Sequence, residues 1–146
     1  MSMSNQTDCI FCNIIQKKIP CVSIYNSDNF IAFLDINPVN KGHTLIVPKK
    51  HVETMFDVDP SLGTDLLSIM QHIGPAIMKA TNTEGINVIQ NNYVAAGQEV
   101  LHLHWHIIPR FIGDSRIHCE KGKYKNHQEM IDIATNINSI LYSNYS

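Results

Sequence analysis

Apolar and polar residues along the chain form short alternating runs and three helical patterns. Alternation with a period of two is typical of β-strands and predicts them at 21–26, 29–35, 43–48, 86–92 and 100–110. Apolar residues spaced three and four apart predict helices over about 9–16, 59–82 and 128–143. Asp59 and Pro60 are typical of a helix start, and Gly74-Pro75 is expected to kink the long helix.

This order of elements predicts an α+β fold, in which a sheet is layered on helices. A chain of 146 residues fits one compact domain, 1–146, with a core at about 9–110 and a C-terminal segment at 111–146. The long helix carries one apolar stripe that can cover the sheet, made of Leu62, Leu66, Ile69, Met70, Ile73 and Ile77.

Composition and charge narrow the possible partners. The net charge is -2, and the longest basic run is Lys49-Lys50, so nucleic acid is not an expected partner. The N-terminus lacks the pattern of a signal peptide, and apolar runs are too short for a membrane span. We therefore expect a cytoplasmic protein, whose four cysteines stay reduced.

Candidate chemistry is concentrated in "GQEVLHLHWHIIPR", where His102, His104 and His106 occupy alternate positions. In a strand the three imidazoles would share one face. They could converge on a catalytic zinc ion, or the central imidazole could act as a nucleophile. Cys9 and Cys12 have the spacing of half a zinc site, although a redox pair or two buried cysteines would fit as well.

Four collinear blocks, "IFCNIIQKKIP", "FLDINPVNKGHTLIVPKKH", "VIQNN" and "AGQEVLHLHWHIIPR", resemble the histidine triad (HIT) family of nucleotide hydrolases and transferases, especially its bacterial-type branch. The resemblance implies a HIT-like fold, with an antiparallel sheet packed with a long central helix and a C-terminal helix. It also implies a homodimer, with the long helix and a strand in the interface.

The resemblance implies a reaction as well. His104 would attack the α-phosphorus of a purine nucleoside phosphoramidate, an adenylylated compound or a dinucleoside polyphosphate. A covalent nucleotidyl-histidine would form, and a backbone carbonyl would hold the proton on the other imidazole nitrogen. His43, His106, Asn91, Gln98 and the backbone N–H of Val100 would stabilise the phosphoryl oxygens.

Further residues match the nucleoside and metal sites of the family. Asp35 would accept the ribose hydroxyls, and an apolar slot for the base would be formed by Ile10, Phe11, Ile19, Phe33 and Ile36. Without the resemblance these apolar residues would be assigned to the core. The bacterial-type branch also implies a closed, structural zinc site, with the ligands Cys9, Cys12, His51 and His102.

One position departs from the family pattern. Glu99 replaces a serine or threonine near the leaving group, and it could protonate an amine only with a raised pKa. A regulatory protein that binds nucleotides without catalysis, and a hydrolase with zinc on three histidines, remain alternatives. No role follows for His72, His118 or His127, which are expected to be surface or core histidines.

Overall fold

The computed structural model describes residues 8–114 and 122–143, which fall in two compact units separated after Asp114. The first unit contains helices α1 (Ile10–Ile15) and α2 (Gly63–Thr81) and five strands. The strands are β1 (Ser23–Asn26), β2 (Phe30–Leu34), β3 (Thr44–Pro48), β4 (Gly85–Gln90) and β5 (Trp105–Arg110). Short 3-10 helices lie at Pro60–Leu62 and Val94–Ala96. The second unit contains helix α3 (His127–Ser143).

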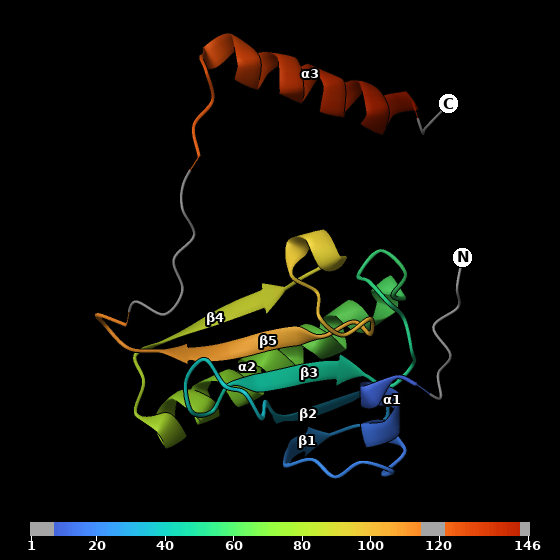
Figure 1. Cartoon of the computed structure of the whole chain (residues 1–146), viewed down its shortest axis with the longest axis vertical. Helices are drawn as coiled ribbons and strands as arrows, with labels where there is room; N and C mark the ends of the chain where they lie inside the picture. The colour runs from blue at the N-terminus through green and yellow to red at the C-terminus, as the bar shows by residue number, and fades with distance from the viewer. Residues whose placement is uncertain (1–7, 115–121, 144–146) are drawn as a thin grey trace. The chain divides into compact units, whose positions relative to one another are not determined.

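The strands form one antiparallel sheet in the order β1-β2-β3-β5-β4 (Figure 1). This arrangement confirms the predicted α+β class and the antiparallel sheet. In the register of the centre, Leu45 of β3 lies opposite His106 of β5. His106, one of the candidate site residues, therefore lies in the middle of the sheet.

Alternation along β2 divides the core between the two faces of the sheet. Ile31 and Phe33 pack with α1, whereas Phe30 and Ala32 pack with α2. The predicted stripe of α2 covers the second face, with Ile69, Ile73 and Ile77 buried and Leu62, Leu66 and Met70 partly buried against the sheet. The helix runs through Gly74 and Pro75 as one element to Thr81.

The predicted strand over 100–110 starts too early. Pairing of β5 begins at Trp105, so His102 and His104 precede the strand, and the Leu103 N–H donates to the Val52 carbonyl instead of a sheet neighbour. The pairing of β5 with β3 likewise stops at Trp105, which lies opposite Ile46. Two of the three histidines therefore lie on an irregular segment, and their rings contact the ring of Phe11 in α1.

The loop before β3 depends on a glycine. Gly42 has a φ of +93°, and a Cβ at this position would lie 2.6 Å from Cγ2 of Thr81. Both the backbone conformation and the close approach to α2 favour glycine. The tight turn positions His43 directly at the start of β3.

Candidate active site and metal centre

Hydrogen bonds fix the tautomer of His104. Its Nδ1 lies 2.7 Å from the carbonyl oxygen of His102, so Nδ1–H donates and Nε2 carries the lone pair. The side chain is buried, with its ring 5.1 Å from the ring of Phe11 and 4.9 Å from the ring of His106. The expectation that a backbone carbonyl orients this imidazole is confirmed, and the nitrogen with nucleophilic character is Nε2.

His43 and His106 form an ordered pair beside His104. The Val39 N–H donates to Nδ1 of His43 over 3.0 Å, which leaves the proton of neutral His43 on Nε2. That Nε2–H lies 2.9 Å from Nδ1 of His106 and donates to it, so His106 carries its own proton on Nε2. Two hydrogen bonds thus turn His106 into a neutral donor next to the His104 lone pair.

Burial keeps these imidazoles uncharged. Desolvation, followed by the neighbouring histidines, lowers the pKa of His106 to about 4. Desolvation also lowers the pKa of His104, against a smaller opposing effect of its hydrogen bond to His102 and of the charges of Asp35 and Glu99. The pKa of His43 is lowered by burial, against the charge of Asp35. At neutral pH the three imidazoles are therefore uncharged, and each presents one N–H donor and one nitrogen lone pair.

A pH profile follows from these shifts. An ordinary histidine titrates near 6.5, whereas the lowered pKa of His104 keeps its nucleophilic form populated into more acidic solution. We expect kcat/KM to stay level through neutral pH, with an acidic limb whose midpoint lies below the ordinary histidine value. Initial rates from pH 4 to 9 measure this acidic limb, and a midpoint at 6.5 or above would contradict the assignment.

The second cluster contains Cys9, Cys12, His51 and His102, whose ligand atoms all lie within 4.8 Å of one another. Nδ1 of His102 lies 3.3 Å from Sγ of Cys9 and 3.6 Å from Sγ of Cys12. Nδ1 of His51 lies 3.3 Å from Sγ of Cys12 and 3.1 Å from Nδ1 of His102. Tetrahedral zinc places sulfur and nitrogen ligands about 3.6 Å apart and two nitrogens about 3.3 Å apart.

The protonation of this cluster also suits a metal ion. Nε2 of His102 lies 2.8 Å from the carbonyl oxygen of Pro48 and donates to it, which leaves the Nδ1 lone pair directed at the thiols. Burial lowers the pKa of His102 to about 4, and burial and Cys9 raise the pKa of the Cys12 thiol to about 11. A bound cation would stabilise the thiolate, so the four donors fit zinc in a closed site.

Asp35, His43 and His106 form another group whose ligand atoms lie close together. Metal binding there would require a lone pair on Nε2 of His43, which means moving its proton to Nδ1. The proton would then face the Val39 N–H, which already donates to Nδ1. This group therefore fits a metal ion less well than the thiol cluster.

The residues expected to contact a nucleoside differ widely in exposure. Asp35 follows β2, its Oδ1 accepts from the Asn37 N–H, and its Oδ2 lies 3.7 Å from Nε2 of His43. Phe11 and Phe33 are buried with an edge-to-face contact of 5.6 Å, and Ile19 packs partly buried beside them. Ile10 and Ile36 are 44% and 90% exposed, so the expected slot for the base is open to solvent on their side.

The residues expected to hold phosphoryl oxygens differ in exposure. Gln98 is buried, its Oε1 accepts from the Tyr93 N–H, and its Nε2 donates to the carbonyl of Glu53. These two bonds hold the loop before the histidines. Asn91 directly follows β4, Val100 packs against the α1 side of the core, and Glu99 is exposed but close enough to act on the pKa of His104.

Two of the described histidines lie outside these clusters. His72 lies exposed on α2, with its ring 6.4 Å from that of Tyr25, and His127 is the exposed first residue of α3. His118 lies outside the described residues. The expectation of a surface histidine fits His72 and His127.

The fold and the two clusters define an α+β protein with neutral, oriented histidines beside a thiol–imidazole cluster whose four donors could hold a metal ion. The HIT domain matches residues 16–113 of this chain. The chain therefore belongs to the histidine triad (HIT) family, as the resemblance predicted.

Three curated relatives illustrate the family. An uncharacterised HIT-like protein of Methanocaldococcus jannaschii is 45% identical over 81% of this chain and 90% of its own. An Arabidopsis thaliana protein named adenylylsulfatase is 43% identical over 75% of this chain and 55% of its own length. An adenosine 5'-monophosphoramidase of Schizosaccharomyces pombe is 41% identical over 70% of this chain and 74% of its own length.

Solved structures agree in fold. A HIT family protein of Bacillus subtilis superposes with a TM-score of 0.80 at 33% identity, covering 90% of this chain and 96% of that one. A zinc-bound histidine triad protein of Mycobacterium smegmatis gives a TM-score of 0.72 at 32% identity, and the match covers 82% of this chain and 86% of that one. These similarities confirm the HIT-like fold.

Proposed function

We propose that the protein is a nucleotide hydrolase or transferase that cleaves purine nucleoside phosphoramidates or related nucleotidyl compounds through a covalent nucleotidyl-histidine. The observation that carries the proposal is the orientation of His104, whose Nδ1–H is held by a backbone carbonyl and whose Nε2 lone pair lies beside a neutral donor, His106. The names of the Arabidopsis and Schizosaccharomyces relatives support a reaction of this class.

In the proposed reaction, Nε2 of His104 forms a bond to the α-phosphorus while the bond to the leaving group breaks. The Nε2–H of His106 donates to a phosphoryl oxygen, together with Asn91, the Val100 N–H and the amide hydrogen of Gln98 that Glu53 does not occupy. An amine leaving group is protonated on nitrogen from solvent, and it departs as the neutral amine when its bond to phosphorus breaks. Water then attacks phosphorus and releases a proton to solvent, the P–N bond to His104 breaks, and the nucleoside monophosphate is released.

The other assigned residues bind the substrate. Asp35 retains an oxygen that can accept from ribose hydroxyls, because only Oδ1 is engaged by the Asn37 N–H. The buried rings of Phe11 and Phe33, with Ile10, Ile19 and Ile36 at the rim, would contact a purine base. Glu99 would lie near the leaving group, where its charge would favour an amine over a phosphate.

The direct test is release of AMP from adenosine 5'-phosphoramidate by the purified protein. We expect turnover that exceeds the uncatalysed reaction by at least about 10⁶-fold, in the usual range of enzymes. Diadenosine polyphosphates serve as the comparison for phosphoanhydride cleavage. Nucleotide binding by calorimetry with no product after hours would instead support the regulatory alternative.

The structure argues against zinc on the three triad histidines together. Nδ1 of His102 faces the two thiols and His51, and His106 is paired with His43. We propose instead that zinc is bound by Cys9, Cys12, His51 and His102, as a structural ion. With four protein ligands such an ion leaves no position for water, so it would hold α1 against the segment before β5.

We also propose a homodimer in the cytoplasm. Val88 on the edge strand β4 is 51% exposed, and Leu67 on α2 is 57% exposed. Helix α3 leaves an apolar series exposed, which includes Met130, Ile133, Ile137 and Ile140. In the part of the chain that the structure describes, no helix has the length and apolar character to cross a bilayer.

Light scattering of the purified protein should give twice the mass of the 16.5-kDa chain. Val88→Asp should shift the protein towards monomer, because a charge would be buried in the proposed interface. Ile24→Asp, on the opposite edge strand β1, is the matched control and should leave the dimer intact. A wild-type monomer would contradict the dimer.

A further inference from the structure

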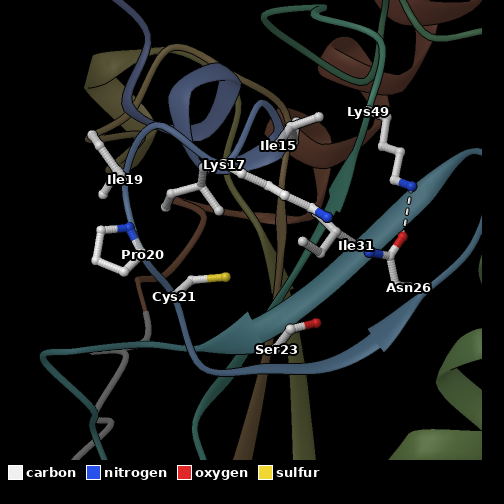
Figure 2. A pocket seen from close by; sticks show the side chains of 10 residues that line it. Ile15, Lys17, Ile19, Pro20, Cys21, Ser23, Asn26, Ile31 and Lys49 are labelled. Carbon is white, nitrogen blue, oxygen red and sulfur yellow. Dashed lines mark hydrogen bonds between the residues drawn. The ribbon is translucent and has the colours of Figure 1, made fainter.

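A pocket of about 460 Å³ lies where the end of α1, the loop after it and the strands β1 and β2 meet (Figure 2). Its apolar walls include Ile14, Ile15 and Ile31. Ile19 also belongs to the expected slot for the base, but Asp35 and His104 do not line the pocket. This volume is therefore separate from the histidine cluster and touches the proposed nucleotide site at one residue.

Two lysines enter the pocket, and its lining contains no acidic side chain. Nζ of Lys49 donates to Oδ1 of Asn26 over 2.6 Å, so the partner of this ammonium is neutral. Lys17 extends towards Asn26 and Ile31 (Figure 2). Among the described residues, the ion pair found between charged side chains joins Arg110 to Asp114, and it does not involve these lysines. The pocket thus combines apolar walls with two positive charges that face neutral groups.

The backbone at Lys17 is unusual for a lysine. Its φ of 61° lies in the left-handed region. The Lys17 N–H donates to the Ile14 carbonyl, and the Lys18 N–H donates to the Asn13 carbonyl. These are the two bonds of a Schellman motif, whose left-handed position is usually glycine. A lysine here is less favourable for the backbone than glycine, and it directs a cation into the pocket.

We propose that this pocket binds a small organic carboxylate with an apolar body, independently of the nucleotide site. The carboxylate would lie between Lys17 and Lys49, where charge-assisted hydrogen bonds are available. The apolar body would lie against Ile14, Ile15 and Ile31 and displace water from them. The volume suits a ligand of about ten heavy atoms, at the lower end of ordinary small-molecule sites.

Octanoate is the probe, and calorimetric titration of the full-length protein measures its affinity. We expect octanol, which lacks the charge, to bind at least about tenfold more weakly. Acetate, which lacks the apolar body, should bind at least about 100-fold more weakly. Equal affinity for octanol and octanoate would overturn the role of the lysines.

Variants at neighbouring lysines localise the charge. Lys17→Gln should weaken octanoate binding at least about fivefold. Lys18→Gln removes the same charge from the next residue, which does not line the pocket, and should have no effect. Lys17→Gly should also weaken binding, while Tm stays level or rises by a few degrees, because glycine suits the left-handed position. Equal effects at positions 17 and 18 would overturn the proposal.

Two further measurements place the ligand. Cys21 lines the pocket and is exposed, so octanoate should slow its alkylation in a Cys119→Ser background. Unchanged alkylation at saturating octanoate would contradict the proposed location. Binding should persist in His104→Ala and in the presence of AMP. Competition by AMP would make the pocket part of the nucleotide site and overturn its independence, whatever the outcome of the hydrolysis assay.

Discussion

Replacing His104 with alanine is expected to lower kcat/KM for adenosine 5'-phosphoramidate by at least about 10⁴-fold, because the nucleophile is lost. Nucleotide affinity should change far less, since Asp35 and the apolar slot remain. The measurement pairs initial rates of AMP release with calorimetric titration of AMP.

Two controls make the His104 result specific. His72→Ala removes an exposed imidazole on α2 outside both clusters and should keep full activity. His104→Asn retains a polar group of similar size near the His102 carbonyl, so it should fold like the wild type yet remain inactive. A folded His104→Ala variant with more than about a tenth of the wild-type rate would refute the nucleophile.

Cys12→Ser is expected to remove bound zinc and to lower Tm by at least about 10 °C. The physical reason is that structural zinc contributes its binding free energy to folding, and a serine hydroxyl is a much poorer ligand than a thiolate. Metal analysis of the purified proteins should give about one zinc per chain for the wild type. Differential scanning calorimetry measures the change in Tm.

The matched control for the metal is Cys21→Ser, since Cys21 is exposed and lies outside the cluster. It should keep both the zinc and the wild-type Tm. Zinc that survives in Cys12→Ser but is lost in His106→Ala would place the ion on the triad. Loss of zinc without any change in Tm would contradict its structural role.

Much of the fold follows from local patterns. Alternation located β2 and β3 within one residue at each end, and the stripe on α2 was recognised because its apolar residues recur at helical spacing and cover one sheet face. The predicted start of β5 was wrong for a physical reason: alternation continues through His102 and His104, but the pairing of β5 with β3 stops at Ile46, although β3 itself continues to Pro48. Pairing between strands is not encoded in the alternation of one strand.

The candidate site could be predicted less completely. The residue types and the resemblance named His43, His104 and His106, and the structure brings these three together. The groups that set their protonation include the Val39 N–H and the His102 carbonyl, which are backbone atoms without a sequence signal. Ile36 shows that residue type can also mislead. Its apolar side chain was expected to line the slot for the base, yet it is almost fully exposed.

The pocket beside α1 was not predicted from the sequence. One feature that marks it is the left-handed backbone of Lys17, which no sequence pattern indicates. Lys17 and Lys49 are 32 positions apart, and nothing in their local sequence indicates that both face one cavity. A lysine at the left-handed position of a helix end becomes informative only once the helix end is known. Such sites depend on tertiary structure, unlike the periodic patterns that define strands and helices.

The central claim is the covalent intermediate on His104, and rapid-quench mass spectrometry tests it most directly. Wild-type protein mixed with adenosine 5'-phosphoramidate and denatured in alkali, where the P–N bond survives, should carry one adenylyl group on the peptide that contains His104. The adduct should form and decay at rates compatible with turnover and be absent from His104→Ala. Turnover without any adduct, or an adduct on another residue, would contradict the account.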